Sequence, residues 1–263
     1  MKPDREFVIA GLKALIGEAH VIAEASSMTP YLIDWRKAFR GDALCVVRPA
    51  TVDDVAAIMR FAKEHHCAIV PQGGNTGLVG GSVPLGRGDE IILSFQRLAH
   101  IRSLDPISGV VVVEAGVTLA MLQDHAEQAG FLFPLSLASE GTATVGGAIA
   151  TNAGGTAALV YGTMRDLVLG LELILPDGTR LETLTSLRKD NTGYHLPALF
   201  MGAEGTLGVI TAASLKLFPL PRSRCTAFCG VASPKEAVEL FRRLKQTSGP
   251  ALTTFELMPR IGL

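Results

Sequence analysis

The sequence lacks the features that mark nucleic-acid-binding, membrane-spanning or disulfide-rich proteins. Its 24 Lys and Arg are balanced by 25 Asp and Glu, so no basic stripe is available for nucleic acid. It has only four cysteines, none of them in a CxxC pair. Lys13 and Glu18 break the N-terminal apolar run before it reaches membrane length, which predicts an amphipathic helix, no signal peptide and no integral membrane segment. We therefore expect a cytoplasmic protein in a reducing compartment.

The cysteine and histidine pairs do not predict a metal site. Cys225 and Cys229 are four residues apart in a strand-like stretch, which would place both on one face. Because no His cluster accompanies them, we interpret them as small buried hydrophobes. His65 and His66 are expected near a helix end, where solvation or the helix dipole accounts for them better than metal ligation.

Two common nucleotide-binding motifs are also absent, although glycine is abundant. The chain has neither the GxGxxG fingerprint of a Rossmann fold nor the Lys-Ser/Thr ending of a P-loop. Instead, residues 71–84 read PQGGNTGLVGGSVP after the apolar run 68–70. Glycines this dense allow positive φ, as we expect at Gly74, and turn successive N–H groups toward one point. Because the loop has no Lys or Arg, it predicts a diphosphate cradle of amides and hydroxyls; the alternative is a tight surface turn.

Three further segments extend this pattern. Residues 134–155 read PLSLASEGTATVGGAIATNAGG, whose glycines and alanines would let a helix pack closely against a flat ring. Residues 204–211, EGTLGVIT, form a turn before an apolar strand, and residues 186–194 read SLRKDNTGY. With YLIDWR at residues 31–36, these motifs resemble the FAD-linked oxidases and dehydrogenases of the vanillyl-alcohol oxidase type, which have a PCMH-type FAD-binding domain. Within that family the chain looks most like the D-2-hydroxyacid dehydrogenase group, which includes D-2-hydroxyglutarate and D-lactate dehydrogenases and a glycolate oxidase subunit.

The resemblance implies an FAD site made from these motifs. Residues 71–77 and Ser82 would surround the pyrophosphate, residues 135–144 and 151–154 would line the isoalloxazine and ribityl chain, and residues 204–210 would close the adenine side. Neither residues 71–84 nor 134–155 contain Cys or His, so we expect non-covalent FAD. The implied cofactor-binding residues are Pro71, Gln72, Gly73, Gly74, Asn75, Thr76, Gly77, Ser82, Pro134, Leu135, Leu137, Glu140, Gly141, Thr144, Gly146, Gly147, Thr151, Asn152, Gly154, Glu204, Gly205, Gly208, Val209 and Ile210.

Two of these assignments have local alternatives. Thr144 and Asn152 are also explained by turn bonding within their own segment. Residues 186–194 are equally well explained as a solvated charged turn and as a segment near the cofactor. His195 stands where the resembled family usually has an acidic residue, so we do not assign it a catalytic role. No catalytic residue is identified.

The order of elements predicts an α+β fold. A strand at residues 46–47, a helix capped by Thr51 and a strand at residues 68–70 form a small βαβ unit. Strands at residues 91–93, 110–113 and 167–175 and a helix over residues 118–128 follow without strict alternation. The resemblance implies an N-terminal helix and lead-in over residues 1–42. The FAD-binding domain would cover residues 43–221, in subdomains of residues 43–103 and 104–221.

Residues 222–263 are expected to begin a truncated α/β substrate or cap domain. A strand at residues 222–231, a helix from Ser233 to about Lys245 and a strand at residues 251–258 would make half of an α/β layer. The resemblance implies oxidation of a D-2-hydroxyacid to the 2-oxoacid by hydride transfer to FAD, with substrate groups in the cap. We therefore expect this chain to bind flavin, to self-associate through uncovered apolar surface, and not to oxidise a 2-hydroxyacid unaided.

Two alternative functions stay open. The chain is also explained as a non-catalytic flavin-binding subunit that needs a partner chain for substrate binding. A remoter alternative is a flavin-dependent reductase of the cell-wall precursor type, although SLRKDNTGY and YLIDWR favour the dehydrogenase group.

Overall fold

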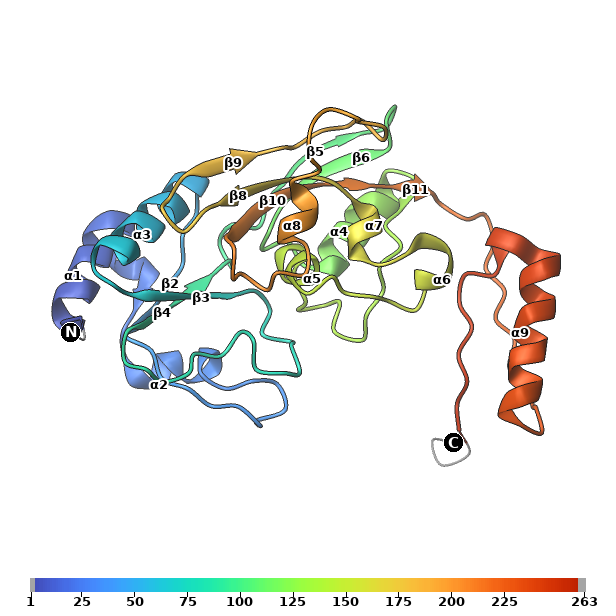
Figure 1. The fold of residues 1–263 in the computed structure, drawn as a ribbon, viewed down its shortest axis with the longest axis horizontal. Helices are drawn as coiled ribbons and strands as arrows, with labels where there is room; N and C mark the ends of the chain where they lie inside the picture. The colour runs from blue at the N-terminus through green and yellow to red at the C-terminus, as the bar shows by residue number, and fades with distance from the viewer. Residues whose placement is uncertain (1–2, 260–263) are drawn as a thin grey trace.

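The computed structural model describes residues 3–259 and has two main sheets flanked by helices (Figure 1). In the first sheet the strand order is β1-β2-β4-β3, with β2, β4 and β3 parallel and β1 antiparallel to β2. The strands are β1 Val21–Ile22, β2 Cys45–Val47, β3 Ala68–Gln72 and β4 Glu90–Ser94. Residues 1–42 were expected to be a lead-in, but β1 makes them part of this sheet.

Two helices pack on one face of the first sheet because each has an apolar stripe. They are α1 Arg5–Ile16 and α3 Val52–Glu64. As predicted, Thr51 caps α3: its hydroxyl accepts from the Asp54 N–H at 3.1 Å, and the Asp54 carboxylate accepts from the Thr51 N–H at 3.1 Å. Leu12 and Ile58 are fully buried in the shared core. The short helix α2 Ala25–Met28 packs on the other face.

The predicted βαβ unit is present, but its two strands are not neighbours. β4 lies between β2 and β3. β3 and β4 are therefore adjacent and parallel, and residues 73–89 connect them without a helix. A crossover between parallel strands is usually helical, and a helix pairs its own amides. This crossover is the glycine-rich loop, so its amides are not paired in that way.

The second sheet is antiparallel and has the order β5-β6-β10-β8-β9. Its strands are β5 Ile101–Asp105, β6 Val110–Glu114, β8 Val168–Ile174, β9 Arg180–Glu182 and β10 Val209–Lys216. The boundary expected between the two FAD-binding subdomains, at residues 103 and 104, falls inside β5. Helices α4 Leu119–Gln128 and α5 Val145–Ala150 pack in the core of this sheet with Phe133 and Leu171. The strands predicted at residues 91–93, 110–113 and 167–175 are confirmed, as is the α+β class.

The remaining elements are short. A two-stranded ribbon pairs β7 Phe131–Leu132 with β11 Phe218–Pro219. The short helices are α6 Ala158–Tyr161, α7 Met164–Leu167 and α8 Pro197–Phe200, with 3-10 turns at Glu18–His20, Thr29–Tyr31 and Gly249–Ala251. Over residues 3–259, no helix is long and apolar enough to cross a membrane.

Charged side chains cluster across the second sheet around Glu172 of β8. Glu172 is fully buried and accepts hydrogen bonds from Arg102 at 3.0 Å and Thr211 at 2.8 Å. Arg180 also forms an ion pair with it. Burial by itself raises the pKa of Glu172, but the hydrogen bonds and the two guanidinium charges outweigh burial, so the pKa lies below its usual value.

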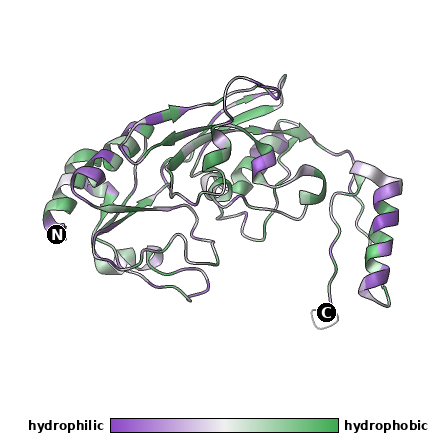
Figure 2. Cartoon of the chain, in the orientation of Figure 1, coloured by the Kyte–Doolittle hydropathy of each residue, from purple (hydrophilic) through white to green (hydrophobic). Residues whose placement is uncertain are grey.

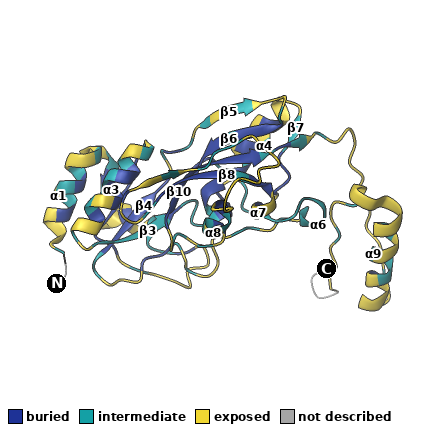
Figure 3. Ribbon diagram, turned by 45° about the horizontal axis from the view of Figure 1, so that its top comes forward, coloured by how far each residue is buried: buried dark blue, intermediate teal, exposed yellow. Residues whose placement is uncertain are grey.

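The C-terminal segment differs from the prediction. The expected helix is α9 Pro234–Ser248, capped by Ser233. Residues 222–231 and 252–258 form no strand, and both are largely exposed (Figure 3). Neither stretch has a sheet edge beside it to pair its N–H and C=O groups. Cys225 and Cys229 are therefore exposed, and their interpretation as buried hydrophobes is wrong. Residues 260–263 of the expected cap lie outside the described residues.

Helix α9 has an apolar stripe that the rest of the described chain covers only in part. Green and purple positions alternate around it in Figure 2. Ala237 is buried and Phe241 contacts Phe255 at 5.2 Å between ring centroids, but Val238 is 67% exposed. The helix stands apart from both sheets in Figure 1.

Candidate functional site

The first glycine-rich loop lies directly against the second small-residue motif. A Cβ on Gly74 would be 1.8 Å from the Thr142 carbonyl oxygen, and one on Gly73 would be 2.3 Å from Thr144 Oγ1. Only glycine leaves room for this backbone contact. The end of β3 is therefore joined to the segment that enters α5.

Residues 204–211, called the third motif below, close the same site from the side of β10. The Glu204 N–H donates to the Ala150 carbonyl at 3.0 Å, which ties the turn to the end of α5. A Cβ on Gly205, which has φ +79°, would lie 2.9 Å from Pro71 Cγ. Three of the four segments that the sequence singles out, residues 71–84, 134–155 and 204–211, therefore meet where the polypeptide leaves β3.

The loop from residue 73 to residue 82, called the phosphate loop below, has unpaired backbone donors. Within the described chain, none of its N–H groups donates a hydrogen bond to another protein group. Residues 73–76 are half-buried. Unpaired buried N–H groups are costly, and consecutive N–H groups that face one region form a binding site for an anion. The phosphate loop therefore fits a diphosphate without needing a basic side chain.

The side chains of the phosphate loop do not all face a ligand. Ser82 Oγ donates to Asn75 Oδ1 at 2.8 Å, so this hydroxyl, expected at the diphosphate, is paired within the protein. Thr76 Oγ1 has no hydrogen-bond partner among residues 3–259. The positive φ expected at Gly74 is wrong: Asn75 and Gly80 have positive φ, and Gly74 is needed for close approach.

In residues 134–155, the second motif, the side chains of Thr144 and Asn152 bond locally, as the alternative explanation for them predicts. Thr144 Oγ1 accepts from the Gly147 N–H at 3.3 Å and caps α5. Asn152 Oδ1 accepts from the Thr163 hydroxyl and the Arg165 N–H, both at 2.9 Å. Gly146 does not lie open for a ring, because its N–H donates to the Ala115 carbonyl at 2.8 Å. The side chains of Thr144 and Asn152 are therefore occupied by partners within the protein.

The other predicted residues of these motifs divide into buried and accessible groups. Glu140 Oε2 accepts from Ser136 at 3.0 Å and Gln123 at 3.3 Å, so its carboxylate also has protein partners. The buried members are Pro134, Leu135, Gly208, Val209 and Ile210. The exposed or half-buried members are Gly77, Leu137, Gly141, Thr151, Gly154 and Glu204.

Residues 186–194 begin far from Val209 of the third motif, and all of them are exposed. Arg188 donates to the Leu217 carbonyl at 3.1 Å, just beyond the end of β10 that is opposite Val209. At about 3.4 Å per residue, these two ends of β10 are about 25 Å apart. Asp190 accepts from the Thr192 N–H in a local turn. The surface-turn alternative is therefore favoured. His195 is exposed.

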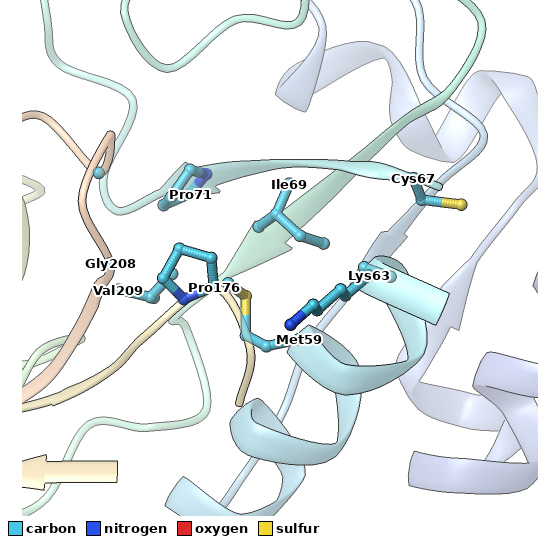
Figure 4. Close-up of a pocket in the computed structure, with 10 residues that line it drawn as sticks. Met59, Lys63, Cys67, Ile69, Pro71, Pro176, Gly208 and Val209 are labelled. Carbon is cyan, nitrogen blue, oxygen red and sulfur yellow. The ribbon is translucent and has the colours of Figure 1, made fainter. Parts of the chain in front are cut away.

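A pocket of about 320 Å³ opens beside the third motif (Figure 4). Figure 4 shows Met59 and Lys63 of α3 on one side and Ile69 and Pro71 of β3 on the other. The lining residues are Met59, Ala62, Lys63, Cys67, Ile69, Pro71, Pro176, Gly205, Gly208 and Val209. Sequence reasoning missed the α3 residues, because an amphipathic helix pattern does not distinguish a core face from a pocket wall.

Two observations bear on whether side chains at this site could act as a reactive thiol or hold a metal ion. Burial raises the pKa of the Cys67 thiol, and the nearby Asp89 charge adds to this. Over residues 3–259, no three His, Cys, Asp or Glu side chains gather in a way that could hold a metal ion. The arrangement favours binding through backbone amides and an apolar pocket.

Comparison with known proteins identifies the family. A family profile described as an FAD binding domain matches residues 43–184. The chain belongs to this FAD-binding family. The mitochondrial D-2-hydroxyglutarate dehydrogenase of Bos taurus is 45% identical over 250 residues, which are 95% of this chain and 45% of that protein. A mitochondrial protein of Schizosaccharomyces pombe, described as a putative D-lactate dehydrogenase, is 41% identical over 235 residues, 89% of this chain and 44% of that protein.

Solved structures show the same fold. Alkyldihydroxyacetonephosphate synthase superposes with a TM-score of 0.75 at 20% identity, over 84% of this chain and 42% of that one. p-Cresol methylhydroxylase gives a TM-score of 0.72 at 22% identity, over 92% and 48%. The predicted resemblance, the PCMH-type fold and the FAD cofactor are confirmed. The FAD-binding chain spans about half the length of the curated relatives it matches.

The expected cytoplasmic location is wrong. The relatives from cattle and fission yeast are both named as mitochondrial proteins, which points away from the cytoplasm. The prediction used the absence of a recognisable leader, and it is overturned by these names.

Proposed function

We propose that this chain supplies the flavin half of a D-2-hydroxyacid dehydrogenase, in which the hydroxyacid is oxidised to the 2-oxoacid. The observation that carries the proposal is the run of unpaired N–H groups in the phosphate loop, placed where three motifs of an FAD-binding domain meet. The hydroxyacid class is supported by the names of the relatives. When bound, FAD would accept the hydride from the substrate carbon.

The structure supports a division of the site into three parts. Amides of residues 73–77 and the Thr76 hydroxyl would hold the pyrophosphate. Backbone of residues 135–144 and 151–154 would line the ring and ribityl chain. The pocket beside Gly205, Gly208 and Val209 would take the adenine, because it is mostly apolar and lies next to Pro71 at the start of the loop. In this proposal the protein binds and orients FAD, and it places few ionisable side chains in the site.

Thiol labelling tests where the adenine lies. In a Cys225→Ser, Cys229→Ser variant, Cys67 is the accessible thiol, because Cys45 is buried and its pKa is raised to about 12. FAD or ADP at about a hundred times its dissociation constant should slow maleimide labelling of Cys67 about a hundredfold, since about 99% of the sites are filled. Riboflavin, which has no adenine, is the control and should not protect. Equal labelling rates with and without FAD would remove this pocket from the site.

A chimera tests whether this chain can serve as the flavin half of a D-2-hydroxyacid dehydrogenase. In it, residues 1–221 of this chain replace the matching part of the cattle D-2-hydroxyglutarate dehydrogenase. We expect it to bind FAD, and D-2-hydroxyglutarate, but not the L enantiomer, to bleach the flavin absorbance anaerobically. A chimera that holds FAD and is bleached by dithionite but not by the hydroxyacid would contradict the role of this chain as the flavin half of such a dehydrogenase while leaving FAD binding intact.

A further inference from the structure

The phosphate loop has a defined shape although it contains no helix or strand. Gln72, which is 2% exposed, lies at its start. Gln72 Nε2 donates to the Ser82 carbonyl at 2.8 Å and to the Tyr31 carbonyl at 2.9 Å. One side-chain amide therefore ties the beginning of the loop to its end, and both to a segment about 40 residues earlier.

Asn75 makes a second connection from the middle of the loop. Its φ of 52° turns the backbone, and Asn75 Nδ2 donates to the Ile33 carbonyl at 2.8 Å and the Pro30 carbonyl at 3.3 Å. Asn75 Oδ1 accepts the Ser82 hydroxyl. Both donors and the acceptor of this amide are thus in use, so the side chain has little capacity left for a ligand.

The carbonyls that receive these bonds belong to a turn that is itself fixed. Asp34 is 3% exposed, and its carboxylate accepts from the Phe39 N–H at 2.7 Å and the Arg36 N–H at 3.2 Å. The Gly41 N–H donates to the Leu32 carbonyl at 3.0 Å. Residues 30–33 therefore present their carbonyls from a rigid support.

We propose that Gln72, Asn75 and Ser82 are positioning residues: through residues 30–33 they hold the phosphate loop in the shape that binds the diphosphate, and they are not themselves ligands. This inference rests on the proposed FAD site. It separates two roles within one motif. The side chains of these three residues bond to the protein, and the backbone N–H groups of the loop stay free.

The two roles predict different kinetics. A variant that loosens the loop lowers the fraction of molecules that can bind, so the apparent dissociation constant rises through a slower association rate. A variant that removes a direct contact speeds dissociation instead. We expect Asn75→Gly, which suits the positive φ but removes both donors, to weaken FAD binding about tenfold through association. Ser82→Ala should do the same to a smaller extent, and Ser82→Thr should restore wild-type binding.

Stopped-flow flavin fluorescence on the full chain measures both rates. Ser108→Ala is the matched control for Ser82→Ala: it removes a hydroxyl that donates to a side-chain oxygen, Asp105 Oδ2, between β5 and β6 and outside the site, so binding should not change. Thr76→Ala should speed dissociation. Faster dissociation with unchanged association in Asn75→Gly and Ser82→Ala, or unchanged affinity in both, would overturn the positioning role. If the Asn75→Gly apoprotein melts at a lower temperature than the wild type, the comparison of Ser82→Ala with Ser82→Thr tests the positioning role instead. A wild-type chain that takes up no FAD would instead refute the proposed function.

Discussion

Gly74→Val is expected to raise the dissociation constant for FAD by up to about a hundredfold while the two sheets stay folded. The first side-chain carbon would sit 1.8 Å from the Thr142 carbonyl oxygen, and backbone cannot move aside as a flexible side chain can. The loop would have to separate from residues 142–144, at a cost of about 1–3 kcal/mol for forced overpacking. At the upper end of that range the affinity falls about a hundredfold.

Flavin fluorescence titration measures this effect, and a second glycine provides the control. A Cβ on Gly77 would meet no protein atom within 4 Å, so Gly77→Ala adds a side chain to the same loop without a clash. The Gly77→Ala apoprotein should melt like the wild type. If Gly74→Val binds FAD as tightly as the wild type, the contact between this loop and residues 142–144 is not part of the FAD site.

Glu172→Ala should lower the melting temperature by about 6–12 °C. The substitution leaves Arg102 and Arg180 without the buried carboxylate, and breaking a buried ion pair costs about 3–5 kcal/mol. Both arginines reach solvent, with 28% and 45% of their side chains exposed, so we expect about 3 kcal/mol. For a chain of this size each kcal/mol corresponds to about 2–4 °C. Glu182→Gln, in a half-exposed pair with Arg180, is the control and should change the melting temperature little.

The same carboxylate should make stability fall in acid. The pKa of Glu172 in the folded protein lies below its ordinary value of 4.5, so the folded state is stabilised above that value. This stabilisation is lost as the pH falls through the lowered folded pKa, because protonation removes the charge that pairs with both arginines. Glu172→Gln should therefore show a shallower loss of melting temperature below about pH 4.5 than the wild type. Parallel curves for the two proteins would show that Glu172 is not responsible.

Local patterns in the sequence predicted the local structure well. The Thr51 cap of α3 and the strand at residues 110–113 follow from the local pattern alone. The meeting of the three motifs came from the family resemblance. The position of β4 between β2 and β3 could not be read in this way, because strand order depends on contacts between distant residues.

The failures have the same physical origin. Residues 222–231 and 251–258 have strand-like composition, but a strand also needs a neighbour, and the described chain offers none there. The protein partners of Asn75 and Ser82 were not predicted either: Asn75 donates to the carbonyls of residues 30 and 33, and Ser82 donates to Asn75 Oδ1. Nothing in the sequence near Asn75 marks those carbonyls as its partners.

The helix-free crossover between β3 and β4 also has a consequence for folding. A nascent chain that ends after Gln72 already contains β2, α3 and β3, whose two strands have no strand between them. In the folded chain β2 and β3 pair with β4 and not with each other, so the sheet cannot be closed until β4 has been synthesised. The buried Glu90 carboxylate at the start of β4 accepts from the Leu85 and Arg87 N–H groups at 2.8 Å, which fixes the end of the crossover as the strand enters. The inner strand β4 and the phosphate loop are therefore completed by one continuous stretch of chain, because residues 73–89 connect β3 to β4.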